Sequence, residues 1–283
     1  MSDSTRLIRC EILDRQIEFP SRPQRVVCLV AGWTEALWQM GLQDSVVGVS
    51  KYCQRYVDTA GKVVAGDYLR VDDAMLDRLN PDLILVTGGV QLGLARRWAK
   101  QGRPVFVLPL PDGMAGILEN IRRLGALMGE MAAAHHLTEQ MDDQIAQLGR
   151  GSTGGDKPPQ VYAELWFGRH PRMAGGLTFV HDIVRLAGGM NILGELAEGY
   201  PRLDVAAVER HRPDVVLLFH EADDHPLDVD EWMQERGWAG RWKFQLIACG
   251  IEPGRNLIHD GPSILDTVAW LQNHPSFIAS ENT

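Results

Sequence analysis

Short apolar runs alternate with amphipathic segments through the first 111 residues of the chain. The apolar runs are rich in Val, Ile and Leu, and they are 25–30, 46–49, 83–87 and 105–108. Helical patterns lie between them at 34–41 and 92–102, and each ends at a glycine. Continuous apolar runs separated by helices are typical of a parallel sheet that is covered on both faces. We therefore predict an α/β lobe over residues 1–111.

Residues 112–150 have a different, continuous helical pattern. One apolar face recurs at spacings of 4, 3, 4 and 3 residues, through Ile117, Ile121, Leu124, Met128 and Met131. We expect a single helix over 116–148, which would extend about 50 Å at a rise of 1.5 Å per residue. Its weakest points are Gly125 and Gly129, because glycine lowers helix stability by about 1 kcal/mol. A helix of that length can link one lobe to another.

Residues 151–283 return to the alternation of the first lobe. The predicted strands are 160–167, 215–219 and 244–250, and the predicted helices are 177–189 and 261–274. This pattern indicates a second α/β lobe with its own parallel sheet.

The two lobes share a repeated segment. Residues 72–86 read DDAMLDRLNPDLILV, and residues 204–218 read DVAAVERHRPDVVLL, at a constant offset of 132. That offset is too long for a solenoid repeat, whose period is about 20–50 residues. In both copies an Asp stands where a helix N-cap is expected, and Pro-Asp stands where the helix ends and a strand begins. The repeat therefore predicts a duplicated architecture rather than a catalytic motif.

Composition narrows the class of protein. The chain has 283 residues, 45% of them hydrophobic and 23% charged, with a formal net charge of −9. These values are those of a globular domain, and the absence of a dense Lys/Arg run argues against a nucleic-acid partner. Four scattered cysteines do not suggest a disulfide framework, and Cys28 is expected to pack as a small hydrophobic residue.

The first 25 residues carry charges throughout and do not resemble a secretory signal. No stretch of the chain approaches the roughly 20 apolar residues of a membrane helix. We therefore expect no membrane insertion and a cytoplasmic location, or a periplasmic one if the sequence has been trimmed.

Four motifs in order carry a resemblance to a known family. They are RVVCLVAGWTEALWQMGLQDSVVGVSKYC, LDRLNPDLILV, IVRLAGGMNILGE and GPSILDTVAWL. The chain resembles the periplasmic-binding-protein family of the vitamin B12 and iron-siderophore type over residues 25–275. The resemblance implies the class III solute-binding fold, shared with chelatases, in which two Rossmann-like lobes with parallel sheets are joined by one long helix. It also implies a bulky ligand held between the lobes, and the chain is similar to cytoplasmic, cobalamin-binding-like members.

The chain departs from this family at the positions that dock on a transporter. Each lobe of a transporter-linked member presents a glutamate seven residues before the Pro-Asp pair. Here those positions hold Ala74 and Ala206. The two alanines count against docking on an ABC permease.

Ligands of α/β lobes bind at the carboxyl ends of the strands. The residues expected there are Gly32, Trp33, Tyr52, Arg55, Tyr56 and Tyr68 in the first lobe, and Trp166, Phe167, Arg169, His170, Tyr200 and His259 in the second. The alternative is that about half of the aromatic rings pack loops onto the sheets. Because neighbouring strand residues face opposite sides, at most one of Trp166 and Phe167 is expected to face a ligand.

These residue types suit a broad, flat ligand. Aromatic rings stack on the faces of a corrin or porphyrin, while Arg and His donate hydrogen bonds to its carboxylates or amides. The leading hypothesis is a non-enzymatic binding protein with no cofactor besides its small-molecule ligand, cobalamin or another metal chelate. The alternatives are a cytoplasmic enzyme acting on such a ligand and a metal-ion carrier that uses residues 220–225 of the segment HEADDHP (220–226). For that segment, a solvated acidic loop is favoured over a metal site, because the spacing does not make its side chains converge.

Overall fold

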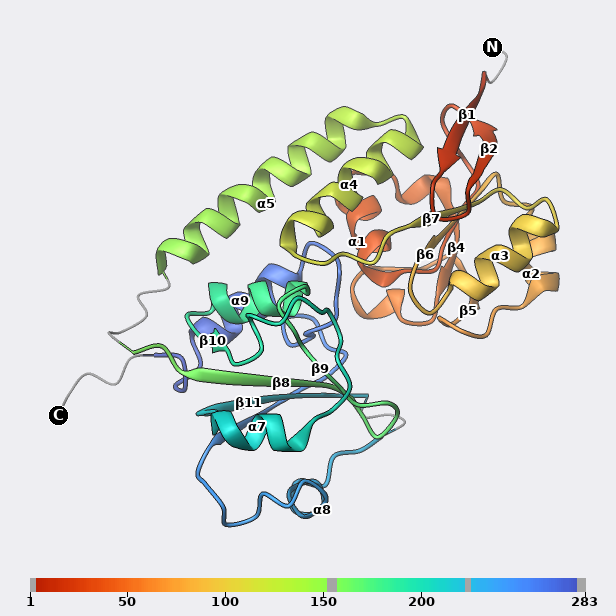
Figure 1. The fold of residues 1–283 in the computed structure, drawn as a ribbon. Coiled ribbons are helices and arrows are strands. Elements are labelled where there is room, and N and C mark those ends of the chain that lie inside the picture. The colour runs from red at the N-terminus through yellow and green to blue at the C-terminus, as the bar shows by residue number, and fades with distance from the viewer. Residues whose placement is uncertain (1–3, 152–156, 222–224, 279–283) are drawn as a thin grey trace. The chain divides into compact units, whose positions relative to one another are not determined.

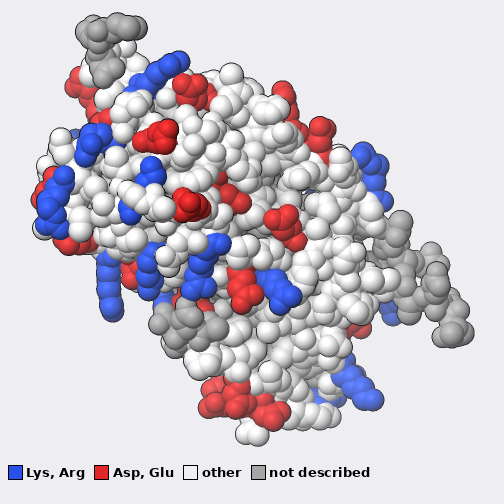
Figure 2. Space-filling view, turned by 180° about the vertical axis from the view of Figure 1, so that it is seen from behind, with Lys and Arg blue, Asp and Glu red and all other residues white. Residues whose placement is uncertain are grey.

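The computed structural model describes residues 4–151, 157–221 and 225–278. The chain forms two compact units (Figure 1). Unit 1 comprises Met1–Pro111, Ala115–Asp142 and Asp260–Pro262, and unit 2 comprises Asp112–Met114, Asp143–His259 and Ser263–Thr283. None of the helices in the described residues is both long and apolar enough to span a bilayer. On the face seen in Figure 2, basic and acidic side chains are interspersed.

Unit 1 is built on a five-stranded parallel sheet with the order β5-β4-β3-β6-β7. Its strands are β3 (Val26–Cys28), β4 (Val46–Ser50), β5 (Val63–Gly66), β6 (Leu83–Thr87) and β7 (Val105–Leu108). Its helices include α1 (Ala31–Gln39), α2 (Asp73–Leu79) and α3 (Leu92–Lys100). Figure 1 shows α1 on one side of the sheet and α2 and α3 on the other. The central strands β3 and β6 are buried along their whole length, which explains their continuous apolar sequence.

An antiparallel hairpin precedes this sheet and was not predicted. It consists of β1 (Thr5–Cys10) and β2 (Arg15–Pro20). The thiol of Cys10 lies 3.5 Å from the backbone N–H nitrogen of Val107 in β7. All four cysteines are buried as free thiols. Burial raises the pKa of Cys28 to about 12, in keeping with its predicted role as a small packing residue.

Unit 2 has a second sheet with the parallel order β10-β8-β11-β12, and a short strand β9 pairs antiparallel with β8. The strands are β8 (Gln160–Phe167), β9 (Arg172–Met173), β10 (Met190–Asn191), β11 (Val215–His220) and β12 (Gln245–Cys249). The helices are α6 (Phe179–Leu186), α7 (Val205–His211), α8 (Val229–Glu235) and α9 (Ile264–Gln272). The predicted α/β class with two parallel sheets is confirmed.

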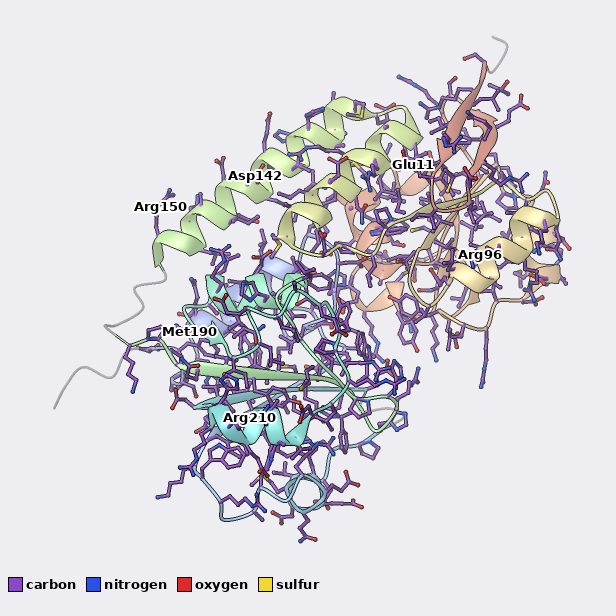
Figure 3. All side chains as sticks on the ribbon, viewed as in Figure 1. Glu11, Arg96, Asp142, Arg150, Met190 and Arg210 are labelled. Carbon is purple, nitrogen blue, oxygen red and sulfur yellow. The ribbon has the colours of Figure 1, made fainter. Side chains whose placement is uncertain are left out.

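The predicted single helix over 116–148 is wrong. The segment forms α4 (Met114–Met128) and α5 (Met131–Gly151), which lie side by side in Figure 1. The chain reverses at Gly129, whose φ is +72°, and a Cβ at Gly125 would lie 2.3 Å from that of Ala134. An ion pair of 3.7 Å joins Arg122 to Asp142, which is labelled in Figure 3. The apolar spacing concealed the turn because each helix of the hairpin needs an apolar face of its own.

A helix still links the two units. The 21-residue helix α5 is about 31 Å long at 1.5 Å per residue. Its residues up to Asp142 belong to unit 1, and its residues from Asp143 onward belong to unit 2.

The repeated segments have the same structural roles in both units. The carboxylate of Asp72 accepts from the N–H of Met75, and that of Asp204 accepts from the N–H of Ala207. Both helices end at a left-handed residue, Asn80 or Arg212. The aspartate of each Pro-Asp pair also accepts backbone N–H groups at the start of a neighbouring strand: Asp82 from Gln24 and Arg25, just before β3, and Asp214 from Gln160, the first residue of β8. The predicted N-caps are confirmed, and the repeat is architectural.

Candidate functional site

Two tyrosines stack on one another at the carboxyl edge of the unit 1 sheet. Tyr52 follows β4 and Tyr68 follows β5. Their ring centroids lie 5.2 Å apart with an interplanar angle of 24°. The ammonium of Lys51 lies 4.9 Å from the centroid of the Tyr52 ring. Both tyrosines are half-buried, so part of each ring remains accessible.

A tight loop holds Tyr68 in this position. The loop begins at Gly66, whose φ is +148° and where a Cβ would lie 2.1 Å from the carbonyl oxygen of Arg70. The carboxylate of Asp67 accepts from the N–H groups of Leu69 and Arg70, both at 2.8 Å. Burial alone would raise the pKa of Asp67, but these hydrogen bonds and the Lys51 charge outweigh it and lower that pKa. The loop is therefore held in one conformation by its own backbone.

The hydroxyl end of Tyr68 reaches into the unit. The backbone N–H of Ala31 donates to it, and the phenol pKa lies well above its ordinary value. Burial is the main cause, followed by the nearby Asp260, Cys53 and Tyr56. Tyr68 thus presents a ring face at the edge of the sheet and anchors its polar end inside.

Two residues of unit 1 that were predicted as ligand contacts are buried in the structure. Trp33 is fully buried, because α1 begins at Ala31 and turns this side chain into the core. Gly32 permits a close approach as predicted, but the group that approaches is the backbone of Asp260 and Gly261 rather than a ligand. Arg55 and Tyr56, at the end of the 3-10 helix η2 (Cys53–Arg55), are half-buried.

Three exposed apolar residues of unit 1 were missed. Leu69, Val90 and Leu110 are 59%, 62% and 44% exposed, and they follow β5, β6 and β7. A Cβ at Gly89 would lie 3.9 Å from the side chain of Leu110, which places the last two loops together. The signal in the sequence was an apolar residue placed directly after a strand and outside any helix.

The corresponding edge of unit 2 carries an aromatic group at the end of β8. The ring of Trp166 stacks on His170, with centroids 5.6 Å apart and 17° between the planes, and lies 5.3 Å from the ring of Tyr200. A tight turn brings them together, since the N–H groups of Arg169 and His170 both donate to the carbonyl of Trp166. Phe167 instead packs against the hydrophobic core of unit 2. Only one of these two neighbours belongs to the aromatic group, and the left-handed φ of +55° at Trp166 marks the end of the regular strand.

Charged groups border this aromatic group. Arg169 pairs with Glu221 at 2.8 Å. His259, predicted as a ligand contact, is only 4% exposed and presents no accessible ring. In the segment 220–226, the ring of His220 lies 3.3 Å from the carbonyl of His225, whereas Asp223 and Asp224 lie outside the described residues. No cluster of three metal-ligating side chains occurs among the residues that the structure describes.

The sequence matches a known protein family. The sequence model of the family described as periplasmic binding protein matches residues 26–241, which is most of the chain. The chain belongs to the periplasmic binding protein family. In this chain, each of the two α/β units carries an aromatic group at the carboxyl edge of its sheet.

Relatives of this periplasmic binding protein include proteins named for binding cobalamin or vitamin B12. A cobalamin-binding protein of Halobacterium salinarum is 31% identical over 213 residues, which are 73% of this chain and 57% of that protein. The chain thus spans little more than half the length of that relative. A vitamin B12-binding protein of Yersinia pestis is 27% identical over 198 residues, 69% of each chain. Staphylococcus aureus IsdE, solved in complex with heme, has the same fold, with a TM-score of 0.74 and 16% identity over 88% of this chain and 97% of that chain.

In this periplasmic binding protein, we expect His170 to be neutral at neutral pH. Burial lowers its pKa, the charges of Arg172 and Arg169 lower it further, and Glu221 opposes them. Glu221→Gln is expected to lower the His170 pKa further, and Arg172→Gln is expected to raise it. An NMR titration of the imidazole measures both. A pKa at or above that of free histidine, or shifts of the opposite sign, would contradict this electrostatic account.

Proposed function

We propose that this chain binds a broad, flat corrinoid at the carboxyl edges of its two sheets. The observation that carries the proposal is the pair of aromatic groups at equivalent edges, Tyr52 with Tyr68 in unit 1 and Trp166 with His170 and Tyr200 in unit 2. Ring faces bind a flat macrocycle through stacking and dispersion without hydrogen bonds of their own.

The surroundings of both groups suit the periphery of such a ligand. Leu69, Val90 and Leu110 offer apolar surface in unit 1. In unit 2, the partly exposed guanidinium of Arg169 has N–H groups that suit amide or carboxylate oxygens. A corrinoid combines a flat ring with peripheral amides, so its apolar parts suit the surface of unit 1 and its amides suit the guanidinium of unit 2.

Corrinoid is favoured over heme by the degree of relatedness. The relatives at 31% and 27% identity are named for cobalamin or vitamin B12, whereas the heme complex shares the fold at 16% identity. Binding without chemistry is the simplest role, and no feature of the described residues favours the enzyme or the metal-ion carrier. Cytoplasmic location and the lack of permease docking through Ala74 and Ala206 stay predictions.

Isothermal titration calorimetry tests the proposal. Purified protein is titrated separately with cyanocobalamin, hemin and molybdate. We expect 1:1 binding of cyanocobalamin with a Kd in the micromolar range or below, about −8 kcal/mol or stronger. If only hemin bound, the ligand would be a porphyrin rather than a corrinoid. If only molybdate bound, the proposal that aromatic rings stack on a flat ligand would be contradicted.

A further inference from the structure

Three residues from the C-terminal part of the chain are built into unit 1. Asp260, Gly261 and Pro262 belong to unit 1, although the chain on both sides of them belongs to unit 2. All three are buried, and Asp260 is only 9% exposed. A buried aspartate needs partners that stabilise its charge.

The partner of this segment is the beginning of α1. A Cβ at Gly32, the second residue of α1, would lie 2.5 Å from the backbone nitrogen of Gly261 and 2.6 Å from the carbonyl carbon of Asp260. It would also lie 2.7 Å from the Oδ1 atom of Asp260. The two backbones are therefore in contact, and no residue except glycine fits at position 32 without displacing the segment.

The Asp260 carboxylate also lies where α1 needs a negative charge. The N-cap of α1 is Val30, which provides no side-chain hydrogen bond to the first turn. A carboxylate near a helix N-terminus interacts favourably with the helix dipole. Asp260 thus supplies from far along the chain the charge that the local sequence lacks.

The hydroxyl end of Tyr68 also lies at the start of α1. The N–H of Ala31, the first residue of α1, donates to its hydroxyl, and Asp260 contributes to the raised pKa of that phenol. The start of α1, the Asp260 carboxylate and the hydroxyl end of Tyr68 therefore form one buried junction. The Tyr68 ring extends from this junction to its stack with Tyr52.

We infer that Asp260 is a positioning residue for the ligand surface of unit 1. It holds the first turn of α1, and that turn holds Tyr68 at the angle that stacks it on Tyr52. The inference rests on the proposed function only for its effect on ligand affinity. The junction itself is a property of the free protein.

Gly32→Ala and Asp260→Asn test this role by two routes. Gly32→Ala inserts a methyl group between two backbones, while Asp260→Asn removes the charge and keeps the shape. The controls are Gly93→Ala, at the second residue of α3 with no atom within 4 Å of the new Cβ, and Asp143→Asn, on an exposed residue in the middle of α5. Hydrogen exchange of peptides covering 29–35, 66–71 and 257–263 reports the junction without any ligand.

We expect both test variants to exchange roughly tenfold faster in these three peptides and to bind cyanocobalamin roughly fivefold more weakly, the effect of losing a helix cap. Both controls should match the natural protein. Asp260→Asn should also lower the pKa of the Tyr68 phenol, followed by absorbance at 295 nm against Tyr68→Phe. The inference would be overturned if Asp260→Asn had the hydrogen-exchange rates and the cyanocobalamin affinity of the natural protein. It would also be overturned if the control variants changed as much as the test variants. Failure of the natural protein to bind cyanocobalamin would instead overturn the proposed function, and the exchange data would still decide the role of Asp260.

Discussion

Replacing Arg236 with methionine is expected to lower the free energy of unfolding of unit 2 by about 3–5 kcal/mol. Its Nη2 atom lies 2.6 Å from the Oε1 atom of Glu164, and its Nε atom lies 3.3 Å from the Oε2 atom. Glu164 is completely buried, and Tyr162 and Trp232 donate to the same carboxylate. Without Arg236, these two neutral donors would face a buried charge with no counterion.

The pH dependence of this pair follows from its surroundings. Burial would lower the pKa of Arg236, but the hydrogen bond and charge of Glu164 outweigh it and raise that pKa. A raised pKa means that the contribution of the arginine is fully present below its unfolded pKa, and it is lost only as the pH rises through the folded value. Arg236 therefore stabilises unit 2 throughout the physiological range.

Arg241→Met is the matched control for Arg236→Met. Arg241 pairs with Glu209 at 2.8 Å, but its side chain is 58% exposed. An exposed pair of this kind contributes about 0–1 kcal/mol. Denaturant-dependent hydrogen exchange of peptides from β8 and β11 measures unit 2 separately from unit 1. Equal losses in the two variants would contradict the assignment of Glu164 and Arg236 as a buried, mutually dependent pair.

Trp166→Ala is expected to weaken cyanocobalamin binding roughly 30-fold, about 2 kcal/mol, as for a central aromatic contact. The indole stacks on His170 and contacts Tyr200, so its removal takes away one ring and leaves two others without their support. Trp166 is only half-buried, and therefore the fold should tolerate the change. Calorimetry with cyanocobalamin measures the affinity, and circular dichroism verifies folding.

Trp270→Ala provides the comparison for Trp166→Ala. Trp270 is also half-buried and lies in unit 2, and its ring centroid is 6.3 Å from that of a histidine, His274. It sits on α9 rather than at the carboxyl edge of the sheet. We expect its loss to leave affinity within about twofold. If Trp270→Ala weakened binding as much as Trp166→Ala, a general loss of stability would explain both effects.

The sequence was a good guide where local chemistry decides the structure. The caps at Asp72 and Asp204 were predictable because an aspartate before a helix has few better uses than accepting its free N–H groups. Alternation along a strand predicted that Trp166 and Phe167 face opposite sides, although a left-handed φ of +55° at Trp166 interrupts that alternation and Phe167 packs on the same core as Tyr162.

Two features of the structure depart from the expectations, one for a local reason and one because two helices pack together. Trp33 does follow β3 as expected, but α1 begins at Ala31 and turns the ring into the core. The sequence marks Gly129 as a weak point of the predicted helix, but the spacing of the apolar residues around it does not show that the chain reverses there. That reversal depends on Gly125 packing against Ala134, a contact between two helices.

The amino-acid sequence by itself determined the two duplicated α/β units, their parallel strands and the helix caps, because these depend on hydrogen bonds and periodicities among near neighbours. Only the tertiary structure decided which aromatic rings stay accessible, where α4 turns back into α5, and that Asp260 meets the start of α1. Those outcomes depend on contacts between segments separated by up to hundreds of residues, and no local pattern records which distant backbone will fill a given space.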